Sequence, residues 1–214
     1  MELRHRPRLL LADDHTLIAE GCKSFLEPEF EVVAVVNDGR AMLKAALELK
    51  PDVVILDIAM PNLNGLDAGE QLRAALRNVK VVYLTMHIEP EVAAEAFRRG
   101  ASAYILKSSA AEELTMAVRS VLRGESYLTP LITKDTVTFL LRSGFGGKPE
   151  KRITSRQSEV LQLLAEGKSM KEIADILQLK PGTVAFHKYK IMETLGLRTN
   201  ADLLRYAIEH HILG

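Results

Sequence analysis

Short apolar runs that each end in a polar residue set the strongest limit on how this chain can fold. Four of them occur in the first half of the chain, at residues 9–12, 53–56, 81–84 and 104–106. They are short and rich in aliphatic or β-branched residues, and longer segments with helical periodicity separate them. Strands that alternate with helices in this way form a parallel sheet, so we expect an α/β domain.

The polar residues that follow these runs indicate a shared pocket. Asp13 and Asp14 follow the first run, Asp57 the second, Thr85 the third and Lys107 the fourth. In an open parallel sheet, binding sites lie beyond the carboxyl ends of the strands, so these side chains should converge. Carboxylate oxygens suit Mg²⁺, and an aspartate nucleophile beside a cation suits capture of a phosphoryl group. Lys107 then supplies a positive charge for the phosphoryl oxygens and Thr85 a hydroxyl donor.

Each of these residues also has a simpler interpretation. Taken alone, Asp13 and Asp14 favour a helix N-cap, because Asp accepts hydrogen bonds from free amides and suits the helix dipole. Taken alone, Asp57 could be a loop carboxylate. Thr85 could be a strand-end cap, and Lys107 could be a solvated charge. Their joint occurrence at successive strand ends favours the pocket.

Five separated segments resemble the receiver domain of bacterial two-component response regulators: Leu11-Ala-Asp-Asp-His15, Val54-Ile-Leu-Asp-Ile-Ala-Met-Pro61, Gly65, Val82-Tyr-Leu-Thr-Met-His87 and Gly100-Ala-Ser-Ala-Tyr-Ile-Leu-Lys107. The resemblance covers residues 8–124 and implies a flavodoxin-like, doubly wound, five-stranded parallel sheet. It implies that a sensor histidine kinase phosphorylates Asp57, and that Thr85, Lys107 and Tyr104 form the phosphate-site switch. For Tyr104 this role depends on the resemblance, because aromatic residues on strands usually serve packing.

The same resemblance implies a metal site. Mg²⁺, which the family needs for phosphorylation, would be bound by Asp13, Asp14, Asp57 and the backbone carbonyl of Ala59. A Mg²⁺-dependent phosphatase or phosphotransferase is a second possibility. Such enzymes usually need an acid/base carboxylate two residues after the nucleophile, and Ala59 cannot transfer protons. A phosphorylation-independent interaction module is a third possibility, and the complete acidic pocket argues against it. We therefore expect a protein that is not an enzyme.

Composition adds a boundary and a location. The 214 residues allow one or two domains, and 47% apolar with 26% charged residues is typical of a globular chain. We find no apolar stretch of membrane-spanning length and no signal peptide, so we expect a cytoplasmic protein without a membrane partner. The single cysteine, Cys22, is predicted to lie in the hydrophobic core. Net charge is zero, yet residues 148–214 carry 11 basic and 8 acidic residues, so the two halves differ in sign.

A linker is predicted between the halves at residues 125–150. Gly124 ends a helical pattern over residues 110–123, and a short amphipathic helix follows at 133–141. Residues 143–151 hold several glycines and a proline, which predicts a flexible tether.

Beyond the tether the pattern is wholly helical, with helices predicted at 155–165, 169–177, 181–195 and 200–209. Ser155 is the expected N-cap of the first, Ser169 and Glu172 form a capping box, and Pro181 lies in a first turn. The two central helices are about three residues apart, which is helix-turn-helix geometry.

The helical half, residues 151–214, resembles the LuxR-type DNA-binding domain of the NarL/FixJ class. The matching residues are Thr154, Arg156, Glu159-Val-Leu161, Leu164-Ala165, Gly167, Lys171-Glu-Ile-Ala174, Leu177, Thr183-Val184, His187, Ile191, Leu195-Gly196 and Ala201-Leu203. The resemblance implies a transcription regulator whose unphosphorylated receiver masks the recognition helix. After release, a homodimer would bind double-stranded operator DNA, with Asn200, Ala201 and Leu204 as dimer contacts. RNA polymerase would be a partner if the protein activates transcription.

The recognition helix predicts an unusual DNA-reading face. At 100° per residue, Val184, His187, Ile191 and Leu195 share a core-facing stripe, so His187 should be buried and hydrogen-bonded. The opposite face is apolar and aromatic, which predicts contacts to thymine methyls and a shallow salt dependence of binding. The expected DNA contacts are Lys171, Lys180, Thr183, Ala185, Phe186, Lys188, Tyr189 and Lys190.

Overall fold

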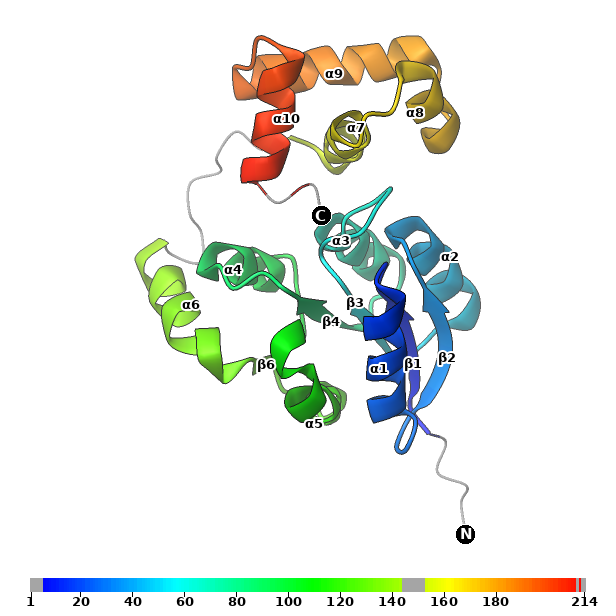
Figure 1. Cartoon of the computed structure of the whole chain (residues 1–214), viewed down its shortest axis with the longest axis vertical. Coiled ribbons are helices and arrows are strands. Elements are labelled where there is room, and N and C mark those ends of the chain that lie inside the picture. Colours follow the sequence, from blue (N-terminus) through cyan, green and yellow to red (C-terminus); the bar gives the residue numbers. More distant parts are fainter. Residues whose placement is uncertain (1–5, 144–152, 211, 213–214) are drawn as a thin grey trace.

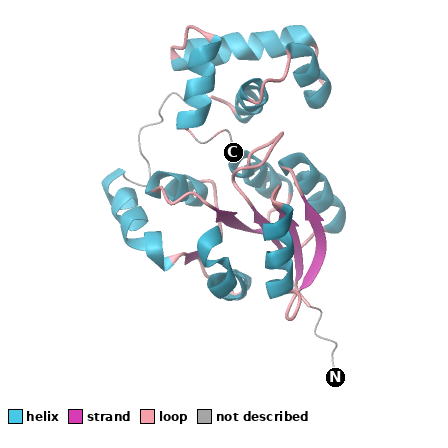
Figure 2. Ribbon diagram, viewed as in Figure 1, coloured by secondary structure: helices cyan, strands magenta, loops and turns pink. Residues whose placement is uncertain are grey.

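The protein consists of an α/β unit followed by a helical unit (Figures 1 and 2). The structure, a computed structural model, describes residues 6–143, 153–210 and 212. Among these residues, no helix is both long and apolar enough to cross a membrane.

The α/β unit is built on a six-stranded, wholly parallel sheet with the order β2-β1-β3-β4-β5-β6. Its strands are β1 (Arg8–Ala12), β2 (Glu31–Val36), β3 (Val53–Leu56), β4 (Lys80–Thr85), β5 (Ala103–Leu106) and β6 (Tyr127–Leu128). The four apolar runs are all strands, as predicted.

Helices cover both faces of this sheet (Figure 2). One face carries α1 (Thr16–Leu26) and α5 (Ala110–Leu122), and the other carries α2 (Gly39–Leu49), α3 (Gly65–Ala75) and α4 (Pro90–Arg98). Successive strand residues point to opposite faces. Leu9 and Leu11 therefore join the α1/α5 core, while Leu10 and Ala12 join the other. Because helices cover both faces of the sheet, the strand sequences are continuous apolar runs without polar alternation.

The sixth strand corrects the expected five-stranded sheet. Tyr127 and Leu128 pair with β5, and Thr129 next to them is fully buried. The Thr129 N–H donates to the carbonyl of Tyr104 at 3.0 Å, and its Oγ1 accepts from the Leu106 N–H at 3.1 Å. A two-residue strand carries no periodicity, so the sequence pattern could not indicate it.

The helix after β6 packs against the receiver-like unit. This helix, α6 (Pro130–Ser143), is longer than the predicted helix at 133–141 and contacts α4. Ile132 is buried in the core that α2, α3 and α4 cover. Part of the predicted linker is thus structured. Residues 144–151 of the predicted tether lie outside the described residues.

The helical unit contains α7 (Ser155–Ala165), α8 (Met170–Leu177), α9 (Pro181–Leu195) and α10 (Asn200–Glu209) around one apolar core. The capping box of Ser169 and Glu172 is confirmed. The N-cap of α7 was misplaced by one residue: it is Thr154, whose Oγ1 accepts from the Gln157 N–H, while the Gln157 side chain returns a bond to the Thr154 N–H. Gln157 thereby completes the capping box that starts α7.

Candidate functional site

Four polar side chains meet at the carboxyl ends of β1, β3 and β5. Asp13 and Asp14 follow β1, Asp57 follows β3, and Lys107 follows β5. The strands are level at this edge, since Ala12 pairs with Leu56. The backbone holds Asp57 in place, because its N–H donates to the carbonyl of Ala12 at 2.9 Å. Parallel strands therefore deliver these groups to one point, as the sequence predicts.

Lys107 connects the two buried carboxylates. Its Nζ lies 2.6 Å from Oδ2 of Asp57 and 2.8 Å from Oδ2 of Asp13, and all three side chains are almost fully buried. Burial raises the pKa of Asp57, although the Lys107 ammonium opposes this shift. Burial also disfavours the charge on Lys107, but its hydrogen bonds to Asp13 and Asp57 outweigh that effect and raise its pKa. The pairing therefore favours the charged forms of Lys107 and Asp57 inside the pocket.

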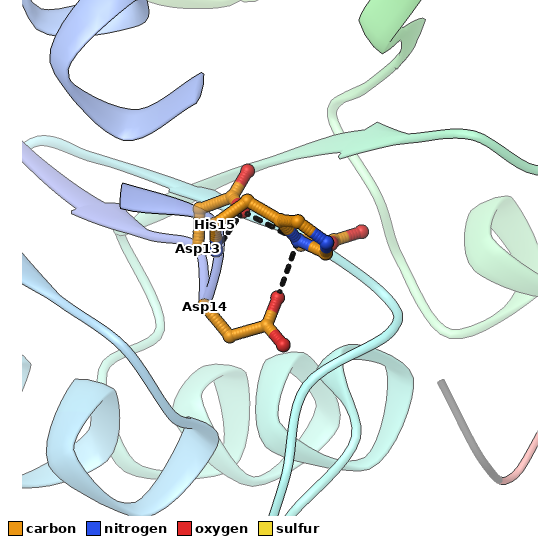
Figure 3. Close-up of side chains that lie close together, drawn as sticks. Asp13, Asp14 and His15 are labelled. Carbon is orange, nitrogen blue, oxygen red and sulfur yellow. Dashed lines mark hydrogen bonds and ion pairs between the residues drawn. The ribbon is translucent and has the colours of Figure 1, made fainter. Parts of the chain in front are cut away.

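His15 is part of the same cluster, which the sequence analysis did not anticipate. Its Nδ1 lies 2.8 Å from Oδ1 of Asp14 and 3.5 Å from Oδ1 of Asp13 (Figure 3). One potential ligand atom each from Asp13, Asp14, His15 and Asp57 falls within 4.8 Å of the others. The sequence feature that could have indicated His15 is its position directly after Asp13 and Asp14.

The donor set suits a hard divalent cation. Asp13 and Asp57 are 3% and 2% exposed, and Lys107 is the cation that contacts both among the described residues. Two buried carboxylates with one ammonium leave a net negative charge, which a divalent cation would offset. Ala59 reaches the pocket through its N–H, which donates to Oδ1 of Asp57 at 3.3 Å.

Thr85 and Tyr104 lie near each other around one backbone segment. Thr85 ends β4 and is fully buried, and its Oγ1 accepts from the His87 N–H at 3.2 Å. The Tyr104 hydroxyl donates to the His87 carbonyl at 3.0 Å. Burial raises the pKa of Tyr104 far above its usual range, and Glu89 and Asp57 add to this shift. Tyr104 is thus a neutral donor held inside the protein.

The exposed face of α9 carries the aromatic residues predicted for it. Phe186 and Tyr189 are 57% and 68% exposed, while Val184 and Ile191 are fully buried. Lys190 is exposed, but its Nζ lies 2.7 Å from a Glu193 carboxylate oxygen. His187 is half-buried beside the Phe186 ring, and its Nδ1 has no hydrogen-bond partner among the described residues. The predicted hydrogen bond of His187 is therefore absent at that atom.

The other predicted DNA and dimer residues also reach the surface. Lys171 and Lys180 are exposed at α8 and the start of α9, and Thr183, Ala185 and Lys188 are half-buried on α9. On α10, Leu204 is 43% exposed, and Asn200 and Ala201 are exposed.

The contact between the two units runs through α7. Gln162 of α7 is buried against the receiver-like unit, where its Nε2 donates to the carbonyl of Met60 at 2.9 Å. Phe186 and Tyr189 of α9 remain exposed in the same arrangement. In Figure 1, α7 lies between α3 and α9.

Comparison with known proteins agrees with both units. Residues 9–119 match the family model for the response regulator receiver domain, and residues 151–207 match that for bacterial regulatory proteins of the luxR family. The chain is 33% identical to the transcriptional regulatory protein LiaR of Bacillus subtilis, covering 96% of this chain and 99% of that protein. It is 34% identical, with the same coverage, to the oxygen regulatory protein NreC of Staphylococcus aureus.

Solved structures of RcsB, a response regulator of Salmonella typhimurium, resemble the whole chain. One has a TM-score of 0.63 at 25% identity and covers 94% of this chain and 96% of that one. RcsB has also been solved in complex with DNA, and that structure has a TM-score of 0.59 at 25% identity, covering 94% of this chain and 97% of that one.

Proposed function

Because the chain belongs to the family of DNA-binding two-component response regulators, with a receiver domain followed by a LuxR-type domain, we propose that it carries a phosphoryl signal from Asp57 to operator DNA. The observation that supports this most is the pairing of Lys107 with buried Asp57 and Asp13. In this pairing the proposed nucleophile, Asp57, and the proposed phosphate-binding cation, Lys107, lie together, next to carboxylates that suit Mg²⁺.

At Asp57 the chemistry is a transfer between two phosphoryl carriers. A carboxylate oxygen of Asp57 forms a bond to phosphorus, and the bond to the histidine nitrogen of a sensor kinase breaks. Mg²⁺, held by Asp13, Asp14, Asp57 and the carbonyl of Ala59, would neutralise charge on the transferred group. Lys107 would stay charged and would exchange its carboxylate partner on Asp57 for the phosphoryl oxygens.

The switch would use Thr85 and Tyr104. A phosphoryl group adds negative charge and acceptor oxygens at the strand ends. The Thr85 hydroxyl can donate to such an oxygen if it gives up its bond with the His87 N–H. Because Tyr104 binds the carbonyl of the same residue, the two side chains would respond together.

The output would be DNA binding by a homodimer. The exposed face of α9 would enter the major groove, with Thr183, Ala185, Phe186 and Tyr189 towards the bases. Lys171, Lys180, Lys188 and Lys190 would contact phosphates. Asn200, Ala201 and Leu204 of α10 would pair two domains, and RNA polymerase would be a further partner of an activator. We also propose that the protein acts in the cytoplasm, where a DNA-binding regulator has access to its operator.

The test is phosphorylation of the full chain by acetyl phosphate with Mg²⁺, followed by intact-protein mass spectrometry. The wild type should gain one phosphoryl group, and Asp57→Asn should gain none while keeping its circular dichroism spectrum. Asp135→Asn, an exposed position on α6, makes the same chemical change and should react like the wild type. Equal labelling of Asp57→Asn and wild type would refute the role of Asp57.

A further inference from the structure

His15 adds a nitrogen atom to a pocket whose other potential metal ligands are carboxylate oxygens. Its Nδ1 lies 2.8 Å from Oδ1 of Asp14 and 3.5 Å from Oδ1 of Asp13 (Figure 3). We propose that His15 is a metal ligand, and that it makes the pocket select transition metal ions such as Co²⁺, Ni²⁺ or Zn²⁺ over Mg²⁺. This inference rests on the proposed cation site at Asp13, Asp14 and Asp57.

The start of α1 does not explain why an imidazole stands at this position. His15 is the N-cap residue of α1, where Ser, Thr, Asp and Asn are preferred because their oxygens accept hydrogen bonds from free helix amides. The His15 side chain makes no such capping bond. Only its backbone carbonyl serves the helix, by accepting from the N–H groups of Ile18 and Ala19 at 3.0 Å each. The side chain is directed towards the two aspartates instead (Figure 3).

The backbone holds the His15 ring beside the aspartates while leaving it open to solvent. The His15 N–H donates to Oδ1 of Asp13 at 2.9 Å, which closes the turn that follows β1. Asp13 is itself fixed, because it is 3% exposed and its Oδ2 lies 2.8 Å from Nζ of Lys107. The His15 side chain, in contrast, is 63% exposed. An ion can therefore reach the ring from solvent without opening the domain.

Lys107 and His15 contact different oxygens of the pocket. Nζ of Lys107 lies at the Oδ2 atoms of Asp57 and Asp13, whereas His15 lies at Oδ1 of Asp13. One potential ligand atom each from Asp13, Asp14, His15 and Asp57 falls within 4.8 Å of the others. A cation bound beside His15 would therefore leave the ion pairs of Lys107 in place.

The type of donor atom determines which ion gains from His15. Mg²⁺ takes oxygen ligands and keeps several waters, so a water can stand in for a ring nitrogen at little cost. Imidazole suits Zn²⁺, Cu²⁺, Fe²⁺ and Ni²⁺. Ligands about 2.1 Å from a shared ion and at right angles lie about 3 Å apart. The 2.8 Å between His15 Nδ1 and Asp14 Oδ1 is close to that spacing. His15 should therefore strengthen the binding of transition metal ions and leave that of Mg²⁺ almost unchanged.

The experiment measures Co²⁺ and Mg²⁺ binding to the full-length protein by isothermal titration calorimetry. His15→Gln removes the ring nitrogen but keeps a polar side chain that can hydrogen-bond to Asp14. His210→Gln is the matched control, because it makes the same change at an exposed histidine that follows α10 in the DNA-binding domain. Asp57→Asn locates the site by removing a carboxylate. Circular dichroism checks that each variant is folded.

We expect His15→Gln to lose about tenfold or more in Co²⁺ affinity, since even groups that only orient a metal ligand typically contribute about 10–100-fold. Its Mg²⁺ affinity should stay within about twofold of the wild type, because water can replace the ring. His210→Gln should match the wild type for both ions. Asp57→Asn should bind both ions more weakly.

NMR spectroscopy distinguishes a metal ligand from a residue that only orients Asp14. Co²⁺ is paramagnetic, so the ring protons of a coordinated histidine shift far outside their usual range. The wild type and His210→Gln should show such shifted ring protons on adding Co²⁺, and His15→Gln should not.

Three results would overturn the inference: equal Co²⁺ affinities in His15→Gln and the wild type, parallel losses of Co²⁺ and Mg²⁺ affinity in His15→Gln, or shifted histidine protons that persist in His15→Gln. Failure of the proposed function gives a different pattern, in which acetyl phosphate with Mg²⁺ leaves Asp57 of the wild type unlabelled, whatever the two metal affinities are. The metal selectivity and the phosphorylation are therefore tested by separate measurements.

Discussion

Asp57 is buried, so its ionisation should destabilise the folded state. Burial raises its pKa above the value of 3.8 for an exposed aspartate. The folded state therefore holds the proton more tightly than the unfolded state. The stabilising effect of this proton is complete below the unfolded pKa and is lost as pH rises through the folded pKa.

The variant Asp57→Asn should show this cost directly. Lys107 would keep Asp13 as a partner at 2.8 Å, so no buried ammonium is left unpaired. In metal-free buffer near neutral pH, we expect the variant to be more stable than the wild type, on the order of 1 kcal/mol. The difference should shrink as pH falls from neutral through the raised pKa of the folded Asp57 carboxyl, because the wild type then becomes protonated too. Urea denaturation of both proteins across this range measures it, and a difference that grows at low pH would contradict the argument.

The sequence predicted the pocket residues because parallel strands place their carboxyl ends at one edge. Asp13, Asp57 and Lys107 are therefore found together without knowledge of any contact distance. Gln162 could not be predicted in the same way. Its role depends on how two units dock, and a glutamine on a helix has no pattern that separates an interface from a solvated face.

At the scale of elements, β6 shows how a very short strand can be stabilised by one side chain. Thr129 is fully buried, and its Oγ1 accepts from the Leu106 N–H and donates to a Glu113 carboxylate oxygen at 2.8 Å. These bonds hold the start of α6 against the end of β5. The sequence analysis predicted a linker here, because composition does not reveal a hydrogen bond.

Thr129→Val should weaken the receiver while keeping the side-chain shape. The Leu106 N–H and the Glu113 carboxylate would lose a partner, which typically costs about 1–3 kcal/mol. Scanning calorimetry of the full chain should show a lower midpoint for the receiver transition and an unchanged one for the DNA-binding domain. Thr138→Val is the control and should stay near the wild type, because Thr138 is half-buried and its hydroxyl donates to the Lys134 carbonyl within α6. Equal midpoints for the two variants would contradict the proposed stabilisation of the receiver by the Thr129 hydroxyl.

Helix α9 makes a prediction about salt dependence. Lys190 lies 2.7 Å from Glu193, so part of its charge is already compensated within the helix. Glu193→Ala should free Lys190 for a DNA phosphate and steepen the slope of log affinity against log salt by about 0.9. Glu209→Ala removes the same charge from α10 and should leave the slope unchanged. Fluorescence anisotropy at several salt concentrations measures both slopes, and a parallel change in the two variants would indicate a general charge effect.

For the whole molecule, the arrangement of the two domains determines which step phosphorylation controls. The reading face of α9 is exposed while α7 is docked, so contact with a single half-site should not depend on release. The proposed pairing of two domains through α10 requires each domain to adopt the orientation that the operator demands. Control should therefore act on the pairing of half-sites.

We expect beryllofluoride with Mg²⁺ to strengthen binding to a fragment with two half-sites by about tenfold or more, and binding to one half-site far less, because linked contacts gain from effective concentration. Half-sites should lie about one helical turn apart, and inserting half a turn should abolish the gain. Leu204→Arg on α10 should also abolish it, while Leu131→Arg, 73% exposed on α6, should not. Electrophoretic mobility shifts with DNA selected from genomic fragments provide the measurement. An equal gain on one and two half-sites would show instead that the receiver blocks α9 itself.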